Sequence, residues 1–230
     1  MTSVIAQYGI ESVAFEGLTD APSAGESPKP HPVQPRGSRL AAWVLGALRW
    51  KLRFEGLPAQ QGVLVVYPHT SNWDFVVLML AKWALGVQAS FWGKDSLFRI
   101  PLFGQWLRWM GGVPVDRSAS RGVVGQMVDL LHVQQARHGY FWLALSPEGT
   151  RRAQPGWRSG FYRIAVQAGV PLGLVRVDFC RREISAVDFL QLSGDEPQDM
   201  ARIATVYDGV RGCRPEQAAP VRLMGSNARH

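Results

Sequence analysis

Short apolar runs alternate with longer segments of helical length through most of the chain. The apolar runs that predict strands cover residues 62–68, 88–92, 112–115, 140–146 and 171–179. The segments that predict helices lie between and after them, over residues 74–85, 97–110, 121–137, 158–168 and 196–211. Strands that alternate with helices are typical of a parallel sheet covered by helices. The pattern therefore predicts an α/β fold with a mostly parallel sheet flanked by helices.

The N-terminal part departs from this alternation. Residues 1–38 end in a Pro-, Gly- and Ser-rich stretch, and we expect them to form a flexible tail. Residues 39–54 combine apolar side chains with four bases, which predicts a short N-terminal apolar helix. Such a helix fits packing in the core and an interfacial position on a membrane equally well. No uncharged apolar run reaches about 18 residues, so no transmembrane helix is predicted, and we expect one folded domain over 39–230.

The charge balance narrows the choice of partner. The chain carries a formal net charge of +7 and contains nine tryptophans. A basic folded protein suggests a phosphate-bearing partner: a nucleic acid, an anionic membrane or a phosphorylated substrate. Cys180 and Cys213 lie in no metal-ligand spacing, so we expect reduced thiols in a cytosolic compartment.

The stretch "HTSNWD" places His69 and Asp74 five positions apart directly after the 62–68 strand. On one helix these positions would point about 140° apart, so the two side chains can meet only if His69 lies on the turn and Asp74 in the first helical turn. An aspartate bonded to one imidazole nitrogen leaves the other free to take a proton from a substrate hydroxyl. A histidine bonded to a capping carboxylate, without chemistry, explains an isolated pair equally well.

Two further polar stretches follow strands. Asp116 and Arg117 come after the 112–115 strand, and Glu148, Gly149, Thr150 and Arg151 come after the 140–146 strand. Open α/β sheets place their ligands at the carboxyl ends of the strands, so we expect these residues to converge on one rim. Arginine at such a position suits bidentate phosphate binding.

Other bases are less specific. Arg152, Arg158 and Arg163 fit a solvated helix face, taken singly. The stretch around Lys94 has the glycine and lysine of a phosphate-binding loop but the wrong spacing. Lys94 remains a candidate contact for a substrate phosphate.

Four blocks in this order carry a family resemblance. They read "HTSNWD", "GGVPVDR", "SPEGTRR" and "GVPLGLV". Over residues 40–225 the chain resembles the glycerolipid acyltransferases typified by 1-acylglycerol-3-phosphate acyltransferase. The resemblance implies transfer of a fatty acyl group from acyl-CoA or acyl carrier protein to the hydroxyl of a lysophospholipid, with 1-acyl-sn-glycerol-3-phosphate as the expected acceptor.

The resemblance also implies roles for residues. His69 would be the general base and Asp74 would orient it, with no acyl-enzyme. The acceptor's glycerol phosphate would be held by Arg117, Glu148, Gly149, Thr150 and Arg151. The donor is a co-substrate, and we expect neither a metal nor a cofactor. We further expect the acyl chain to lie in a groove lined from segments 75–92 and 97–110.

Alternatives remain open at this point. Pro68 and Ser146 depart from the residues usual in the family, which leaves the acceptor open, with a lyso-ornithine lipid as one alternative. A non-catalytic basic module for membrane or nucleic acid would explain the charge, but it does not need His69 and Asp74. We therefore expect an enzyme that binds no nucleic acid and sits peripherally on the cytoplasmic face of the cell membrane, held by the 39–54 helix.

Overall fold

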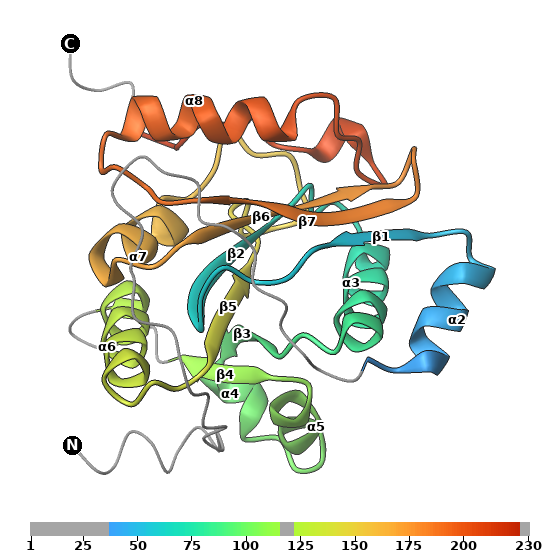
Figure 1. The fold of residues 1–230 in the computed structure, drawn as a ribbon, viewed down its shortest axis with the longest axis horizontal. Coiled ribbons are helices and arrows are strands. Elements are labelled where there is room, and N and C mark those ends of the chain that lie inside the picture. Colours follow the sequence, from blue (N-terminus) through green and yellow to red (C-terminus); the bar gives the residue numbers. More distant parts are fainter. Residues whose placement is uncertain (1–36, 116–121, 226–230) are drawn as a thin grey trace.

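The computed structural model describes residues 37–115 and 122–225 and is built around one seven-stranded sheet (Figure 1). The strand order is β1-β7-β6-β2-β5-β3-β4, and neighbouring strands are parallel except β6 and β7. The strands are β1 (Lys51–Phe54), β2 (Gln61–Tyr67), β3 (Ala89–Lys94), β4 (Gly112–Val115), β5 (Phe141–Leu145), β6 (Leu172–Asp178) and β7 (Glu183–Leu190). The predicted mostly parallel sheet flanked by helices is confirmed.

Helices cover both faces of the sheet. They are α2 (Arg39–Ala47), α3 (Asn72–Leu85), α4 (Asp95–Phe98), α5 (Phe103–Trp109), α6 (Gly122–Ala136), α7 (Gly160–Ala168) and α8 (Glu196–Tyr207), followed by the 3-10 helix η1 (Pro215–Gln217). Side chains of β2 alternate between the two faces. Val63 and Val65 join the core formed with α6, α7 and α8, whereas Leu64 and Val66 join the core formed with α3. This central strand therefore ends between two filled layers.

The predicted helix over 39–54 is wrong in its second half. Helix α2 ends at Ala47, the chain turns through Arg49 with φ of 60°, and Lys51–Phe54 form the edge strand β1 beside β7. The four residues of β1 alternate between exposed and half-buried. That period of two is the signature of a strand. Of the tail predicted over 1–38, residues 1–36 lie outside the described residues.

The helix predicted over 97–110 is also divided in two. α4 ends at Phe98 and α5 begins at Phe103, with Pro101 in the connection. Proline has no amide hydrogen to continue a helix and disfavours the helical conformation of the residue before it.

Strand β7 was not predicted. It runs antiparallel to β6 and gives β1 its parallel neighbour. Its exposure changes irregularly along the strand, so its sequence lacks a clear period of two.

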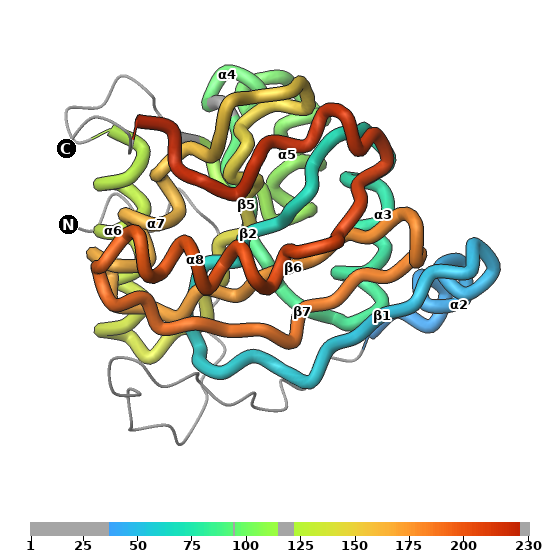
Figure 2. Tube along the Cα trace, turned by 90° about the horizontal axis from the view of Figure 1, so that it is seen from above, coloured from blue at the N-terminus to red at the C-terminus, as the bar shows by residue number. Residues whose placement is uncertain are grey.

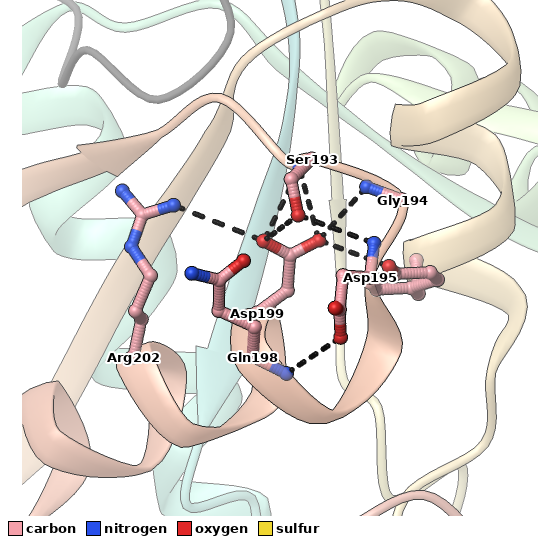
Figure 3. A network of polar contacts seen from close by, with 7 residues as sticks. Ser193, Gly194, Asp195, Gln198, Asp199 and Arg202 are labelled. Carbon is pink, nitrogen blue, oxygen red and sulfur yellow. Dashed lines mark hydrogen bonds and ion pairs between the residues drawn. The ribbon is translucent and has the colours of Figure 1, made fainter.

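The segment after α8, residues 208–225, is here called the C-terminal strap. Figure 2 shows it in red, running back from the end of α8 along the edge where β2 and β5 end. At the other end of α8, the fully buried Asp199 accepts hydrogen bonds from the backbone of Ser193 and Gly194 and from the Tyr162 hydroxyl (Figure 3). These bonds fix the start of α8.

Candidate active site

His69 and Asp74 meet as the spacing predicts. His69 lies on the turn after β2, and Asp74 is in the first turn of α3. The distance from His69 Nδ1 to Asp74 Oδ2 is 3.4 Å, with the histidine side chain 19% exposed and the aspartate fully buried. This contact is longer than a well-formed hydrogen bond, as catalytic contacts commonly are before substrate binds. It leaves Nε2 as the ring nitrogen available to a substrate.

A capping box holds Asp74 in place. Ser71 is the N-cap of α3, and its hydroxyl accepts from the amide of Trp73 at 3.2 Å. Asp74 Oδ2 in turn accepts from the amides of Ser71 (2.7 Å) and Thr70 (2.5 Å). A serine followed three residues later by an acid is the sequence signature of this motif. Because the same oxygen faces His69, the helix cap also orients the imidazole.

Glu148 fixes the backbone of His69. It follows β5, the parallel neighbour of β2, and is 1% exposed. Its Oε2 accepts from the amide of His69 at 2.6 Å, and its Oε1 accepts from the amide of Ala219 in the C-terminal strap at 2.9 Å. Burial raises the pKa of Glu148, and the two amide bonds partly oppose that rise. The geometry favours a positioning role for this carboxylate over direct contact with an acceptor.

Tyr67 links β2 to the same part of the strap. Its hydroxyl donates to the carbonyl oxygen of Ala219 at 2.9 Å. Burial, together with the nearby charge of Glu148, raises the pKa of Tyr67 to about 12, which keeps the phenol a neutral donor. The end of β2, the Glu148 loop and the strap therefore form one bonded unit behind His69.

An apolar cavity of about 670 Å³ opens at His69. It lies between α3 and the sheet, and its walls include Phe75, Leu78 and Met79 from α3 with Leu64 and Val175 from β2 and β6. The groove expected from segment 75–92 agrees with this lining. Segment 97–110 contributes none of the lining residues, because α4 and α5 pack around a separate small core with Phe98 and Leu107.

Lys82 is an unexpected base in the wall of this cavity. Its ammonium donates to the carbonyl oxygen of Met110, and burial lowers the Lys82 pKa to about 8. It lies ten residues along α3 from Asn72, which is about 15 Å of helix. A charged group thus faces the part of the cavity far from His69.

A second, polar pocket of about 360 Å³ adjoins the first. Its lining consists of Thr70, Ser71, Asn72, Trp73, Arg151, Arg152, Arg214 and Gln217. Arg151 and Arg152 line both pockets, so they stand at the boundary between them. Within residues 37–115 and 122–225, neither of these two arginines forms an ion pair with an acid.

The remaining predicted residues have different positions. Gly149 has φ of 68°, a backbone conformation that favours glycine, and a Cβ there would lie 2.7 Å from Nε of Arg158, so another residue would have to displace the Arg158 side chain. Thr150 lines the apolar cavity, and its hydroxyl accepts from the amide of Arg152 at 3.4 Å. Lys94 is the last residue of β3, which pairs with β5. Arg117 lies outside the described residues.

Sequence reasoning missed the contribution of the C-terminal strap. Thr70 is 1% exposed, and its hydroxyl accepts from the amide of Arg214 at 3.0 Å. The side-chain amide of Gln217 is oriented so that its NH₂ group faces two backbone carbonyl oxygens, and it donates to those of Arg151 (2.6 Å) and Thr70 (3.2 Å). The only sequence signal was a base-containing stretch after the last predicted helix.

Comparison with known proteins places this site in a family. A family model described as "Acyltransferase" matches residues 51–175, which is 125 of 230 residues. The chain therefore belongs to the acyltransferase family, as the four sequence blocks indicated. The matched range includes His69, Asp74 and Glu148 but ends before the C-terminal strap.

Two relatives are similar to this chain. It is 34% identical over 84 residues to "1-acyl-sn-glycerol-3-phosphate acyltransferase" of Escherichia coli (strain K12). The aligned region covers 35% of this chain and 33% of that protein. The chain thus matches about a third of the length of that curated relative. The chain is also similar to the crystal structure of the 1-acyl-sn-glycerophosphate (LPA) acyltransferase PlsC from Thermotoga maritima, with 21% sequence identity and a TM-score of 0.47. The superposed region covers 72% of this chain and 73% of the PlsC chain.

Proposed function

We propose that the protein transfers a fatty acyl group from a thioester to the hydroxyl of a lysophospholipid, with 1-acyl-sn-glycerol-3-phosphate as acceptor. The observation that carries this proposal is the position of His69. It lines the apolar cavity, the next residues Thr70 and Ser71 line the arginine-containing pocket, and Arg151 and Arg152 line both. An acyl chain suits the first pocket and an anionic headgroup the second, which brings the thioester and the acceptor hydroxyl together at the imidazole.

The reaction needs one proton shuttle. His69 Nε2 takes the proton of the acceptor hydroxyl while the hydroxyl oxygen attacks the thioester carbonyl carbon. The new C–O bond forms, the C–S bond breaks, and the leaving thiolate receives the proton back from His69. Asp74 holds the imidazole in the tautomer that has Nε2 free and stabilises the imidazolium during the step. Such a positioned base typically contributes about 10²–10⁴-fold.

The acyl chain would occupy the cavity beneath α3. Each buried CH₂ group contributes about 0.8 kcal/mol, so a long chain supplies most of the donor's binding energy. The thioester head would then lie at His69, whether it belongs to acyl-CoA or to acyl carrier protein. Lys94 and Arg117 remain candidate contacts for the phosphates of either substrate.

We further propose that the protein binds peripherally to the cytoplasmic face of the cell membrane. Exposed apolar side chains gather on α2, where Trp43 is 69% exposed, and around α5, where Trp109 is 72% exposed and the N-cap Leu102 is 79% exposed. α2 packs on α3, and the Trp83 ring of α3 lies 5.9 Å from the Trp109 ring of α5, so these helices form one surface. Apolar rings bordered by bases suit the headgroup region of an anionic bilayer. In residues 37–115 and 122–225 no helix has the length and apolar character needed to cross a membrane.

An acyl-transfer assay tests the proposal. Purified protein is mixed with lysophosphatidic acid in detergent micelles and with acyl-CoA or acyl carrier protein in parallel, and both free thiol and diacyl product are quantified. We expect equal amounts of thiol and phosphatidic acid with at least one donor. Thiol release without acylated lipid, or vesicle binding without any transfer, would contradict the proposal and favour a hydrolase or a binding module.

A further inference from the structure

The polar pocket contains an arginine that no sequence block predicted. Arg214 lies on the C-terminal strap, 39 positions beyond the end of the matched range at residue 175, yet it lines the same pocket as Arg151 and Arg152. The pocket is thus built from three segments: the start of α3, the loop after β5 and the strap. Its third basic residue comes from a part of the chain that the family model does not match.

The backbone of the strap is held against both other segments. The amide of Arg214 donates to the hydroxyl of the buried Thr70, and Gln217 donates to carbonyl oxygens of Thr70 and Arg151. The amide of Ala219 donates to Glu148, which also accepts from His69. The guanidinium of Arg214 therefore starts from a backbone whose position is tied to the histidine.

The charged residues that line the pocket are all arginines. Arg151, Arg152 and Arg214 line it together, and none of the three forms an ion pair within residues 37–115 and 122–225. A terminal phosphate carries a charge of about −1.5 to −2 and three acceptor oxygens, which planar guanidinium groups bind in pairs of hydrogen bonds. A zwitterionic headgroup carries less net negative charge, and its ammonium group would be repelled by the same arginines.

We propose that Arg214 is a specificity-determining residue that favours acceptors with a terminal phosphate over acceptors with a zwitterionic phosphodiester headgroup. This inference rests on the proposed acyl transfer, and it deepens it by assigning headgroup selection to the C-terminal strap. Gln217 is the positioning residue that keeps the strap against Thr70 and the Arg151 loop. Lysine at position 214 would keep the charge but lose the planar fork.

Steady-state kinetics test the assignment. The acceptors are 1-acyl-sn-glycerol-3-phosphate and 1-acyl-sn-glycero-3-phosphocholine, and the variants are Arg214→Ala and Arg214→Lys, with Arg211→Ala as the matched control. Arg211 is an exposed arginine of the same strap that does not line the pocket. We expect Arg214→Ala to raise KM for the phosphate acceptor about ten-fold, the loss of one charge-assisted contact, with the Lys variant intermediate. The donor KM, the phosphocholine reaction and the Arg211 variant should change little.

Calorimetric binding of glycerol 3-phosphate separates this inference from the function itself. The wild-type protein should bind it, and Arg214→Ala should bind it about ten-fold more weakly, whether or not any acyl transfer is detected. An unchanged acceptor KM and unchanged glycerol 3-phosphate affinity in Arg214→Ala, in an active enzyme, would overturn the inference and leave the proposed function standing. Intact, Arg214-dependent binding without transfer to any lysolipid would instead support the pocket and refute the proposed reaction.

Discussion

Replacing Glu148 with Gln should damage the catalytic step without weakening the acceptor contact. The carboxylate accepts two backbone amides, from His69 at 2.6 Å and Ala219 at 2.9 Å, while almost fully buried. A glutamine amide offers one acceptor oxygen and turns an NH₂ group toward the other amide. Leaving a buried donor unsatisfied costs about 1–3 kcal/mol, and a hydrogen bond to a charged group contributes about 1.5–3 kcal/mol. We therefore expect Glu148→Gln to lower the free energy of unfolding by roughly 2–4 kcal/mol.

The substitution should also lower kcat, because the lost hydrogen bond allows the backbone of His69 to move. A misplacement of about 1 Å at a catalytic group costs on the order of 10²-fold in rate. We expect kcat to fall by about this factor, with the KM values of donor and acceptor nearly unchanged. The assay is thiol release with each substrate varied separately, together with urea unfolding of the same preparation.

Asp199→Asn provides the matched control. Asp199 is an equally buried carboxylate that accepts backbone amides, but it holds the start of α8 rather than His69 (Figure 3). It should lose similar stability and keep kcat. A Glu148→Gln enzyme with normal kcat and a raised acceptor KM would refute this reasoning and restore Glu148 to direct acceptor binding.

Two further predictions concern the cavity wall and the exposed aromatic surface. Lys82 has a folded pKa of about 8 against 10.5 for an exposed lysine, so the unfolded chain holds its proton to higher pH and the free energy of unfolding should rise between pH 8 and 10. Lys82→Met should raise the free energy of unfolding at pH 7 by about 1–3 kcal/mol and abolish its rise with pH. Urea unfolding at pH 7 and pH 9 measures both effects. A lower free energy of unfolding at pH 7 would mean that the hydrogen bond from Lys82 to Met110 outweighs the cost of burying the charge. The double variant Trp106→Ser/Trp109→Ser should bind anionic vesicles roughly ten-fold or more weakly than the wild-type protein in co-sedimentation, whereas Val166→Ser on α7 should bind them normally. Equal binding by the wild-type protein and both variants would exclude α5 from the membrane surface.

The fold and the His–Asp pair could be predicted because local patterns encode them. The strands β2 to β6 are apolar runs, and the capping box joins Ser71 and Asp74, which lie only three positions apart. The edge strand β1 was missed because its four residues bury few side chains. Strand β7, which lies between β1 and β6, was missed because its burial pattern has no clear period of two. The C-terminal strap could not be predicted because its bonds join residues far apart in sequence, 144 positions between Thr70 and Arg214 and 71 between Glu148 and Ala219.

The lining of the acyl groove could also be predicted only in part from the sequence. Segment 75–92 was expected to line it, and that lining is present. Segment 97–110 was also expected to line it, but Pro101 divides this segment and its two helices pack around a separate core. The tertiary contacts distinguish the two segments.

The central claim is that His69 is the base that activates the acceptor hydroxyl. The measurement that tests it most directly is kcat of His69→Ala with lysophosphatidic acid and a saturating thioester donor, beside His132→Ala, an exposed histidine of α6, as the control. We expect a loss of about 10²–10⁴-fold for His69→Ala with unchanged thermal stability, and normal turnover for His132→Ala. Near-full turnover by a folded His69→Ala protein would contradict it.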